Sequence, residues 1–184
     1  MVFKLVPSGP VVRDPRDNRR LPPGLSDTEM EAVLEGGDPL VSVIPVVEQH
    51  VTHSTAQPPA QPYEVQRREQ TLVRTYATYL RNRGSSVGLL RVVPTGEANA
   101  LRNDVYDETR ENIVEAKGTG TRAAVRMALA QVLDYGRFAP EARRAVLLPE
   151  RARPYLEELL HTYDIHVVWP TSSGFADNAD RVFT

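Results

Sequence analysis

Two charged side chains stand close together in an otherwise apolar stretch of the sequence, residues 112–117. The stretch reads as a short strand, and because strand side chains alternate between faces, Glu115 and Lys117 point the same way. A carboxylate and an ammonium group on one face of such a strand can bind a divalent metal ion and a phosphate. The alternative is a solvated cross-strand ion pair, which does not explain why the neighbouring residues are so apolar.

A second carboxylate precedes this strand. Asp104 lies 11 residues before Glu115, and a hairpin with a short turn would bring the two side by side on neighbouring strands. Two such carboxylates can hold Mg²⁺, which prefers oxygen ligands, and the carbonyl of Ala116 could supply another oxygen. Lys117 would then orient or deprotonate a water, or neutralise charge that develops on a phosphate. Asp107 is also near; we favour Asp104 because it falls inside the predicted strand, whereas Asp107 starts the turn.

The helix predicted after this strand carries two polar side chains on an apolar face. Gln131 and Tyr135 are four residues apart and share that face with Ala124, Met127 and Ala128. They need polar partners there, and a phosphate or the lysine would serve. For the tyrosine, a purely structural role as a core aromatic is the competing interpretation.

Glu69 presents a similar conflict in an earlier predicted helix. It falls in the buried stripe, four residues after Val65 and three before Leu72. A carboxylate at that place needs a partner, because a buried unpaired charge is costly. An ion pair with an arginine at the edge of the stripe and a role in the site are both open.

The elements that must position these residues follow from hydrophobic periodicity and from glycine and proline positions. The pattern predicts helix 64–83, strands 87–94, 101–107 and 112–117 in an antiparallel meander, helix 121–138, strand 144–148, helix 154–163 and strand 165–169. This order, αβββαβαβ, is typical of an α/β domain with a mixed central sheet flanked by helices. The tail from residue 171 has no clear periodicity, and we expect it to be irregular.

The residues before 63 read differently. Residues 1–49 contain predicted strands at 2–6 and 40–47 and a short helix at 26–34, and residues 50–62 read as an extended proline-rich linker. So short a segment cannot hold a core alone. It either packs on the domain that follows, 63–184, or is the end of an upstream recognition module. We favour the module, because the chain opens abruptly in an apolar strand.

Composition limits the alternatives. The 184-residue chain is 41% hydrophobic and 25% charged, which predicts a folded core, and its lack of cysteine excludes disulfides and thiolate metal sites. No apolar run is long enough to span a membrane and no secretory leader is evident, so we expect a cytoplasmic protein. The net charge of −2 does not indicate a nucleic-acid binder, although a local basic surface could still bind DNA.

The histidines are assigned no function. His50 and His53 are three residues apart, a spacing that can bind metal on a helix, but the linker that holds them does not read as helical. His161 and His166 fall in the last predicted helix and strand, where we expect structural or exposed side chains. The site therefore depends on carboxylates, one lysine and the polar pair on the later helix.

The series Asp104, Glu115-Ala116-Lys117 and Gln131-Val132-Leu133-Asp134-Tyr135 resembles the motifs of the PD-(D/E)XK nuclease superfamily. It is most similar to the branch that carries a Gln-x-x-x-Tyr motif on the helix after the catalytic strand. The resemblance covers about residues 63–170 and implies a restriction-endonuclease-like αβββαβ core. One departure is that Asn103 stands where the superfamily motif has proline, at a position that varies among its members.

The resemblance also implies roles for single residues. Asp104 and Glu115 would be ligands of Mg²⁺ or Mn²⁺, together with the carbonyl of Ala116, and Lys117 would be the catalytic lysine. Gln131 and Tyr135 would support the site or contact DNA. Glu69 matches an acidic residue that many members offer from their first helix, so it would be a further metal ligand.

The function implied is hydrolysis of DNA phosphodiester bonds by an endonuclease, with a 5′-phosphate product and a role in restriction or defence. Two other functions stay open: a non-catalytic DNA-binding or assembly module on the same fold, and a nuclease that acts on RNA or on repair intermediates. DNA is the expected partner, and a homodimer is compatible with the sequence. Residues 1–49 would then belong to an upstream DNA-recognition domain.

Overall fold

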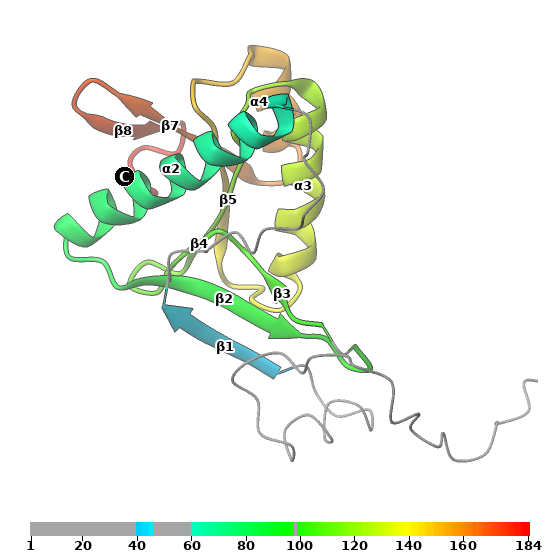
Figure 1. Ribbon diagram of the computed structural model, residues 1–184. Coiled ribbons are helices and arrows are strands. Elements are labelled where there is room, and N and C mark those ends of the chain that lie inside the picture. The colour runs from blue at the N-terminus through cyan, green and yellow to red at the C-terminus, as the bar shows by residue number, and fades with distance from the viewer. Residues whose placement is uncertain (1–39, 46–59, 98) are drawn as a thin grey trace, which may run out of the picture.

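The computed structural model describes residues 40–45, 60–97 and 99–184, which form a mixed eight-stranded sheet and three helices (Figure 1). The elements are β1 (Leu40–Pro45), α2 (Ala60–Asn82), β2 (Val87–Val93), β3 (Leu101–Arg102), β4 (Val105–Asp107), β5 (Asn112–Ala116), α3 (Arg122–Gly136), β6 (Arg143–Leu147), α4 (Pro154–His161), β7 (Ile165–Thr171) and β8 (Gly174–Asp177). The predicted α/β class and mixed sheet are confirmed. The strand expected at 2–6, the helix at 26–34 and the linker histidines lie outside the described residues.

The sheet has an antiparallel and a parallel part. The order is β1-β2-β4-β5-β6-β7-β8, with β3 paired to β2. β2, β4 and β5 form the predicted antiparallel meander, whereas β5–β6 and β6–β7 are parallel pairs. Parallel neighbours need a crossover, and α3 and α4 provide the two crossovers. β5 is therefore the strand at which the antiparallel half meets the parallel half.

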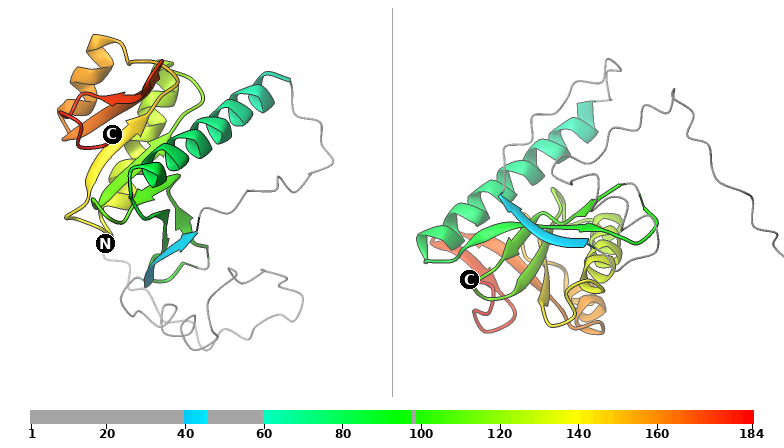
Figure 2. Two further views of the ribbon diagram at one scale, coloured as in Figure 1. Left: turned by 90° about the vertical axis from the view of Figure 1, so that its left-hand side faces the viewer. Right: turned by 90° about the horizontal axis from the view of Figure 1, so that it is seen from below.

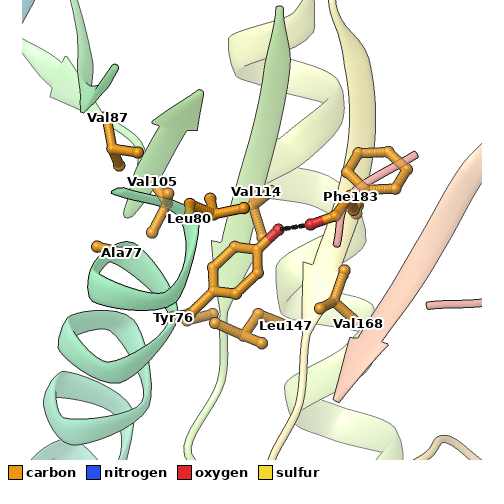
Figure 3. Close-up of a cluster of buried hydrophobic side chains, with 11 residues drawn as sticks. Tyr76, Ala77, Leu80, Val87, Val105, Val114, Leu147, Val168 and Phe183 are labelled. Carbon is orange, nitrogen blue, oxygen red and sulfur yellow. Dashed lines mark hydrogen bonds between the residues drawn. The ribbon is translucent and has the colours of Figure 1, made fainter. Parts of the chain in front are cut away.

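Helices cover both faces of the sheet (Figures 1 and 2). On one face, the buried stripe of α2 includes Tyr76 and Leu80, which pack against Val114 of β5 and Leu147 of β6 (Figure 3). On the other face, α3 and α4 bury apolar side chains against β6 and β7. Each large apolar side chain that is fully buried contributes about 2 kcal/mol. Because successive residues of β5 alternate, Val114 faces α2 and Glu115 faces the side of α3.

The single strand expected at 101–107 is wrong. It is divided into β3 and β4 by Asn103 and Asp104, which belong to neither. Neither glycine nor proline marks the interruption, so residue types alone do not predict it. Its cause lies in the pairing with β2, where the register of β3 and that of β4 differ.

The irregular tail expected after residue 171 is also wrong. β7 continues to Thr171, turns through 172–173 and pairs with β8 in a hairpin. The last residues then fold back into the core, where Phe183 is fully buried and its carbonyl accepts a 2.6 Å hydrogen bond from the hydroxyl of Tyr76 (Figure 3). Pro170 obscured the strand in the sequence, yet the pairing of β7 with β6 ends at Val168, so the missing N–H costs no ladder bond there.

One boundary differs from expectation at the start of the described residues, while β1 begins at Leu40 as expected. α2 begins at Ala60, within the stretch expected to be linker. β1 pairs antiparallel with β2 over its whole length, from Leu40 opposite Val93 to Pro45 opposite Gly88. This part of the N-terminal segment therefore adds a strand to the sheet of the following residues. Among the helices described, none is both long enough and apolar enough to cross a membrane.

Candidate active site

Glu115 and Lys117 lie at the end of β5, where the strand is enclosed. All five residues of β5 are buried, and Glu115 is only 2% exposed. The Nζ of Lys117 lies 2.8 Å from Oε1 of Glu115, so the two form an ion pair. The backbone N–H of Lys117 donates to the carbonyl of Leu147, which keeps the chain attached to β6 one residue past the strand. The pair is thus largely buried, unlike the solvated pair considered as the alternative.

Asp104 completes this group. In the antiparallel pairing of β4 with β5, Val105 lies opposite Val114. The residue before Val105 is Asp104 and the residue after Val114 is Glu115, so these two are brought together. The Oδ2 of Asp104 accepts a 2.8 Å hydrogen bond from the backbone N–H of Ala116. This bond takes the place of a ladder bond that the interrupted strand cannot make. The carbonyl of Ala116, expected as a ligand, remains a prediction.

Asp107, the competing candidate, has a different environment. Its carboxylate accepts hydrogen bonds from the hydroxyl of Ser85 at 2.9 Å and from the backbone N–H groups of Thr109 and Arg110. The guanidinium of Arg110 lies 3.7 Å away. These donors hold the β4–β5 turn and leave little capacity for a metal ion. The geometry therefore favours Asp104 as the acid of the site.

Burial makes the two site carboxyls hard to ionise. It raises the pKa of Glu115 to about 8, and the neighbouring carboxylate of Asp104 adds to that rise, while Lys117 opposes it. Burial also raises the pKa of Asp104, against the hydrogen bond from Ala116 and the charge of Lys117. The Oε2 of Glu115 is buried and has no hydrogen-bond partner in the described part of the chain. A pair of this kind is stabilised by a cation held between its oxygens.

Gln131 and Tyr135 reach the same place from α3. Tyr135 is 7% exposed and packs in a core cluster with Ile113 of β5, so the core-aromatic interpretation is correct for its ring. Burial raises the pKa of its hydroxyl to about 12, and the carboxylate of Glu115 adds to the rise. The Oε1 of Gln131 is buried without a hydrogen-bond partner among the described residues. Met127, expected on this face, is instead 60% exposed.

Glu69 approaches the site from α2. Its Oε2 accepts a 3.0 Å hydrogen bond from the backbone N–H of Gly118, directly after the lysine. A Cβ atom at Gly118 would lie 2.2 Å from the carbonyl oxygen of Val65, so a glycine is needed for α2 to come this close. The negative charge of Glu69 raises the pKa of both Asp104 and Glu115. A backbone partner at Gly118 was named by neither of the two expectations for Glu69.

The donor set fits a hard cation in part. The carboxylates of Asp104 and Glu115 are adjacent, and oxygen ligands of this type suit Mg²⁺ or Mn²⁺. Within 40–45, 60–97 and 99–184, however, no group of three or more His, Cys, Asp or Glu side chains is gathered closely enough to form a metal cage. The orphaned Oε2 of Glu115 is the observation that supports a bound cation, with Glu69 at the margin.

Two residues important to this geometry had not been singled out for it. Asn103 is 3% exposed, and its side chain bonds to the backbone of Leu90 on β2 and of Val105 at the start of β4. Gly118 permits the contact between α2 and the end of β5. The available signals were an amide inside a predicted strand and a glycine immediately after the lysine. By contrast, His161 lies at the exposed end of α4 and the ring of His166 packs near Phe183, so neither adds to the site.

Comparisons with known proteins give no independent assignment. No protein-family model matches this chain, no curated protein matches it, and no solved structure matches it. The residues of the site and their geometry are therefore the basis on which a function can be proposed.

Proposed function

We propose that this protein is a Mg²⁺- or Mn²⁺-dependent nuclease of the PD-(D/E)XK superfamily that hydrolyses DNA phosphodiester bonds endonucleolytically, in restriction or defence. The observation that carries the proposal is the buried group at the end of β5. Asp104 and Glu115 form an acid pair there, and Lys117 lies 2.8 Å from one of its oxygens. Two neighbouring carboxylates can hold a metal ion that activates a water molecule. A lysine beside them can stabilise the phosphate that this water attacks.

The order of elements supports the same superfamily. α2 is followed by the antiparallel β2–β4–β5 meander, by α3, and by β6 parallel to β5. This order is the one expected of the proposed restriction-endonuclease-like αβββαβ core. Glu115 lies on β5, the strand that joins the two halves of the sheet, and Asp104 lies just before the neighbouring strand β4. Tyr135 of α3 lies near Glu115, whose charge raises the pKa of the tyrosine hydroxyl, and Gln131 hydrogen-bonds to Tyr135.

The roles of the residues follow from their positions. Asp104 and Glu115 would hold the metal ion, and Glu69 would contribute from α2. When bound, the ion would polarise the scissile phosphate and lower the pKa of a water molecule. Lys117 would leave Glu115 for the substrate side, where its ammonium group positions the nucleophile and offsets charge on the phosphate. Gln131 and Tyr135 would present polar atoms to the acid pair or to the DNA.

One observation favours a second function, a non-catalytic DNA-binding or assembly module. The 2.8 Å ion pair between Glu115 and Lys117 already satisfies one oxygen of the acid pair without a metal. If Lys117 stays paired with Glu115, the protein would keep its fold but would not bind the metal ion that hydrolysis needs. The two functions differ in whether a divalent cation displaces the lysine.

A cleavage assay separates them. The protein is incubated with supercoiled plasmid, linear DNA, single-stranded DNA and RNA, with Mg²⁺, with Mn²⁺ or with chelator. Nuclease action predicts metal-dependent products that carry 5′-phosphates, and Lys117→Ala and Asp104→Asn should each reduce the rate at least about 100-fold. Asp134→Asn is the matched control, because Asp134 is half-buried on α3 and paired with Arg137. Unaltered cutting by both site variants would refute the site, and binding of DNA without any cutting would support the module.

A further inference from the structure

The break between β3 and β4 is a β-bulge. Arg91 of β2 pairs with Arg102, and Gly88 of β2 pairs with Tyr106. Between these pairs, residues 89–90 of β2 face residues 103–105 of the other strand, so the second strand has one residue more. Bulges of this kind re-aim side chains and occur beside active sites. Asp104 is the middle one of residues 103–105, so the extra residue is either Asp104 or one of its two neighbours.

The side chain of Asn103 fills the gap that this bulge leaves in the hydrogen-bond ladder. Its Oδ1 accepts from the N–H of Leu90 at 2.7 Å, and its Nδ2 donates to the carbonyl of Val105 at 2.6 Å. The carboxamide thus serves one backbone group of the facing strand β2 and one at the start of β4, and Asn103 is 3% exposed. Without it, a buried donor and a buried acceptor would both lose their partners.

We propose that Asn103 is a positioning residue that holds the bulge and thereby directs Asp104 at the N–H of Ala116 and toward Glu115. Its catalytic meaning rests on the proposed nuclease function, whereas the geometric statement does not. If the amide is lost, the ladder can recover its bonds by closing the bulge. A one-residue shift of register turns side chains to the opposite face, so Asp104 would leave the site.

The amide of Ala116 reports on this geometry, because its 2.8 Å hydrogen bond ends on Oδ2 of Asp104. Hydrogen exchange of this amide is measured by NMR in the metal-free parent protein and in Asn103→Ala, relative to the amide of Val114 in each protein. Asn112→Ala is the matched control. Asn112 is 1% exposed, donates to the carbonyl of Val182 and lies at the other end of β5.

If Asn103 positions Asp104, the Ala116 amide exchanges about tenfold faster relative to Val114 in Asn103→Ala and is unchanged in Asn112→Ala. Equal relative exchange in the parent and in Asn103→Ala would overturn the proposal. An equal relative rise in both alanine variants would also overturn the proposal, because the loss of any buried side-chain amide would then have the same effect. Should Asn103→Ala not fold, Asn103→Ser, which keeps one short polar group, replaces it in the test and must itself show faster relative exchange of the Ala116 amide than the parent.

The cleavage assay adds a second readout. In a folded Asn103→Ala protein, the Mg²⁺ concentration for half-maximal cutting should rise about tenfold or more, and Asn112→Ala should keep the parent value. Parent-like metal dependence of Asn103→Ala would overturn the positioning role. If the parent does not cut at all, the nuclease proposal fails, yet the exchange result still decides whether Asn103 directs Asp104.

Discussion

Asp104 and Asp107 lie close together in the sequence, yet the structure uses them in opposite ways. Asp107 is surrounded by donors: one hydroxyl, two backbone N–H groups and the guanidinium of Arg110. Asp104 has one backbone donor, from Ala116, and faces the carboxyl of Glu115. The first aspartate closes a turn, and the second helps to form a site that is electrostatically incomplete.

A second, half-buried acid repeats the donor-rich pattern of Asp107. Asp177, at the end of β8, accepts hydrogen bonds from the backbone N–H groups of Ala179, Arg181 and Phe183 and from the hydroxyl of Thr184. It ties down the last residues of the chain. A carboxylate that serves the fold is thus satisfied by several local donors. Among the described residues, Asp104 and Glu115 instead share the backbone N–H of Ala116 and the ammonium group of Lys117. Unsatisfied polar atoms of this kind are costly to retain and therefore point to a site.

The largest loss of stability should come from removing Asp107, the carboxylate that is surrounded by hydrogen-bond donors. Asp107→Ala removes three hydrogen bonds to a buried carboxylate and leaves Arg110 without its ion pair. We expect a loss of about 4 kcal/mol in the free energy of unfolding, measured by urea denaturation. The fraction that stays folded should bind Mn²⁺ as the parent does. A stability equal to that of the parent would contradict the structural role given to Asp107.

The pair formed by Asp104 and Glu115 predicts an unusual dependence of stability on pH. The pKa of Glu115 is raised from 4.5 to about 8 in the folded protein, so the folded state binds more protons than the unfolded chain between these values. The stability that this proton contributes is complete below the lower value and is lost as the pH rises through the upper one. Without metal, the free energy of unfolding should fall by about 1 kcal/mol per pH unit in that range.

Chelated protein, unfolded with urea at a series of pH values, tests this directly. Glu115→Gln should lack the fall because it has no carboxyl to titrate at that place. Adding Mg²⁺ to the parent should flatten the curve at the alkaline end, since a bound cation stabilises the ionised pair. If the parent and Glu115→Gln show the same slope, the burial of this carboxyl does not control its titration.

The contact between α2 and the end of β5 gives a smaller effect. Gly118→Ala places a methyl group against the carbonyl of Val65 and should cost about 2 kcal/mol of stability and weaken the reach of Glu69 to the site. Gly120→Ala is the matched control, because its Cβ would meet only the side chain of Glu150, at 3.6 Å. Thermal unfolding of both variants measures the difference. Equal melting temperatures would show that α2 can move away at no cost.

The smallest change in stability should carry the opposite sign. Burial raises the pKa of Asp104, so keeping this carboxyl ionised at pH 7 costs the folded protein free energy. Asp104→Asn removes that cost, and its amide oxygen can still accept from Ala116. We expect the metal-free protein to gain about 1 kcal/mol at pH 7 while it loses metal binding. Urea unfolding gives the stability. A loss as large as that of Asp107→Ala would place Asp104 among the structural acids.

Much of the fold could be predicted because local patterns determine it. Helical spacing of Tyr76 and Leu80 and alternation around Glu115 were enough for the elements and their faces. The bulge at Asn103 could not be predicted, because it arises from the register of three strands rather than from any one of them. The β7–β8 hairpin was hidden by Pro170, whose missing N–H matters only if a ladder bond is required there.

The site shows the same limit. Asp104, Glu115 and Lys117 could be selected from residue type and strand alternation, and the structure brings them together. The preference for Asp104 over Asp107 rested on its place in a strand, but the strand is broken at that point and the distinction comes from hydrogen-bond donors. Glu69 could be flagged as a buried acid. Its partner, a backbone N–H beyond the lysine, follows from a helix-to-strand contact that only the tertiary structure provides.

The central claim is that the pair formed by Asp104 and Glu115 binds a divalent cation, whereas the donor-rich acids do not. Isothermal titration of Mn²⁺ into the parent, Glu115→Gln and Asp134→Asn at pH 8 tests it most directly. The account predicts one saturable site in the parent and in Asp134→Asn, and no heat of binding in Glu115→Gln at the same concentrations. Equal binding by all three proteins, or none by the parent, would contradict it.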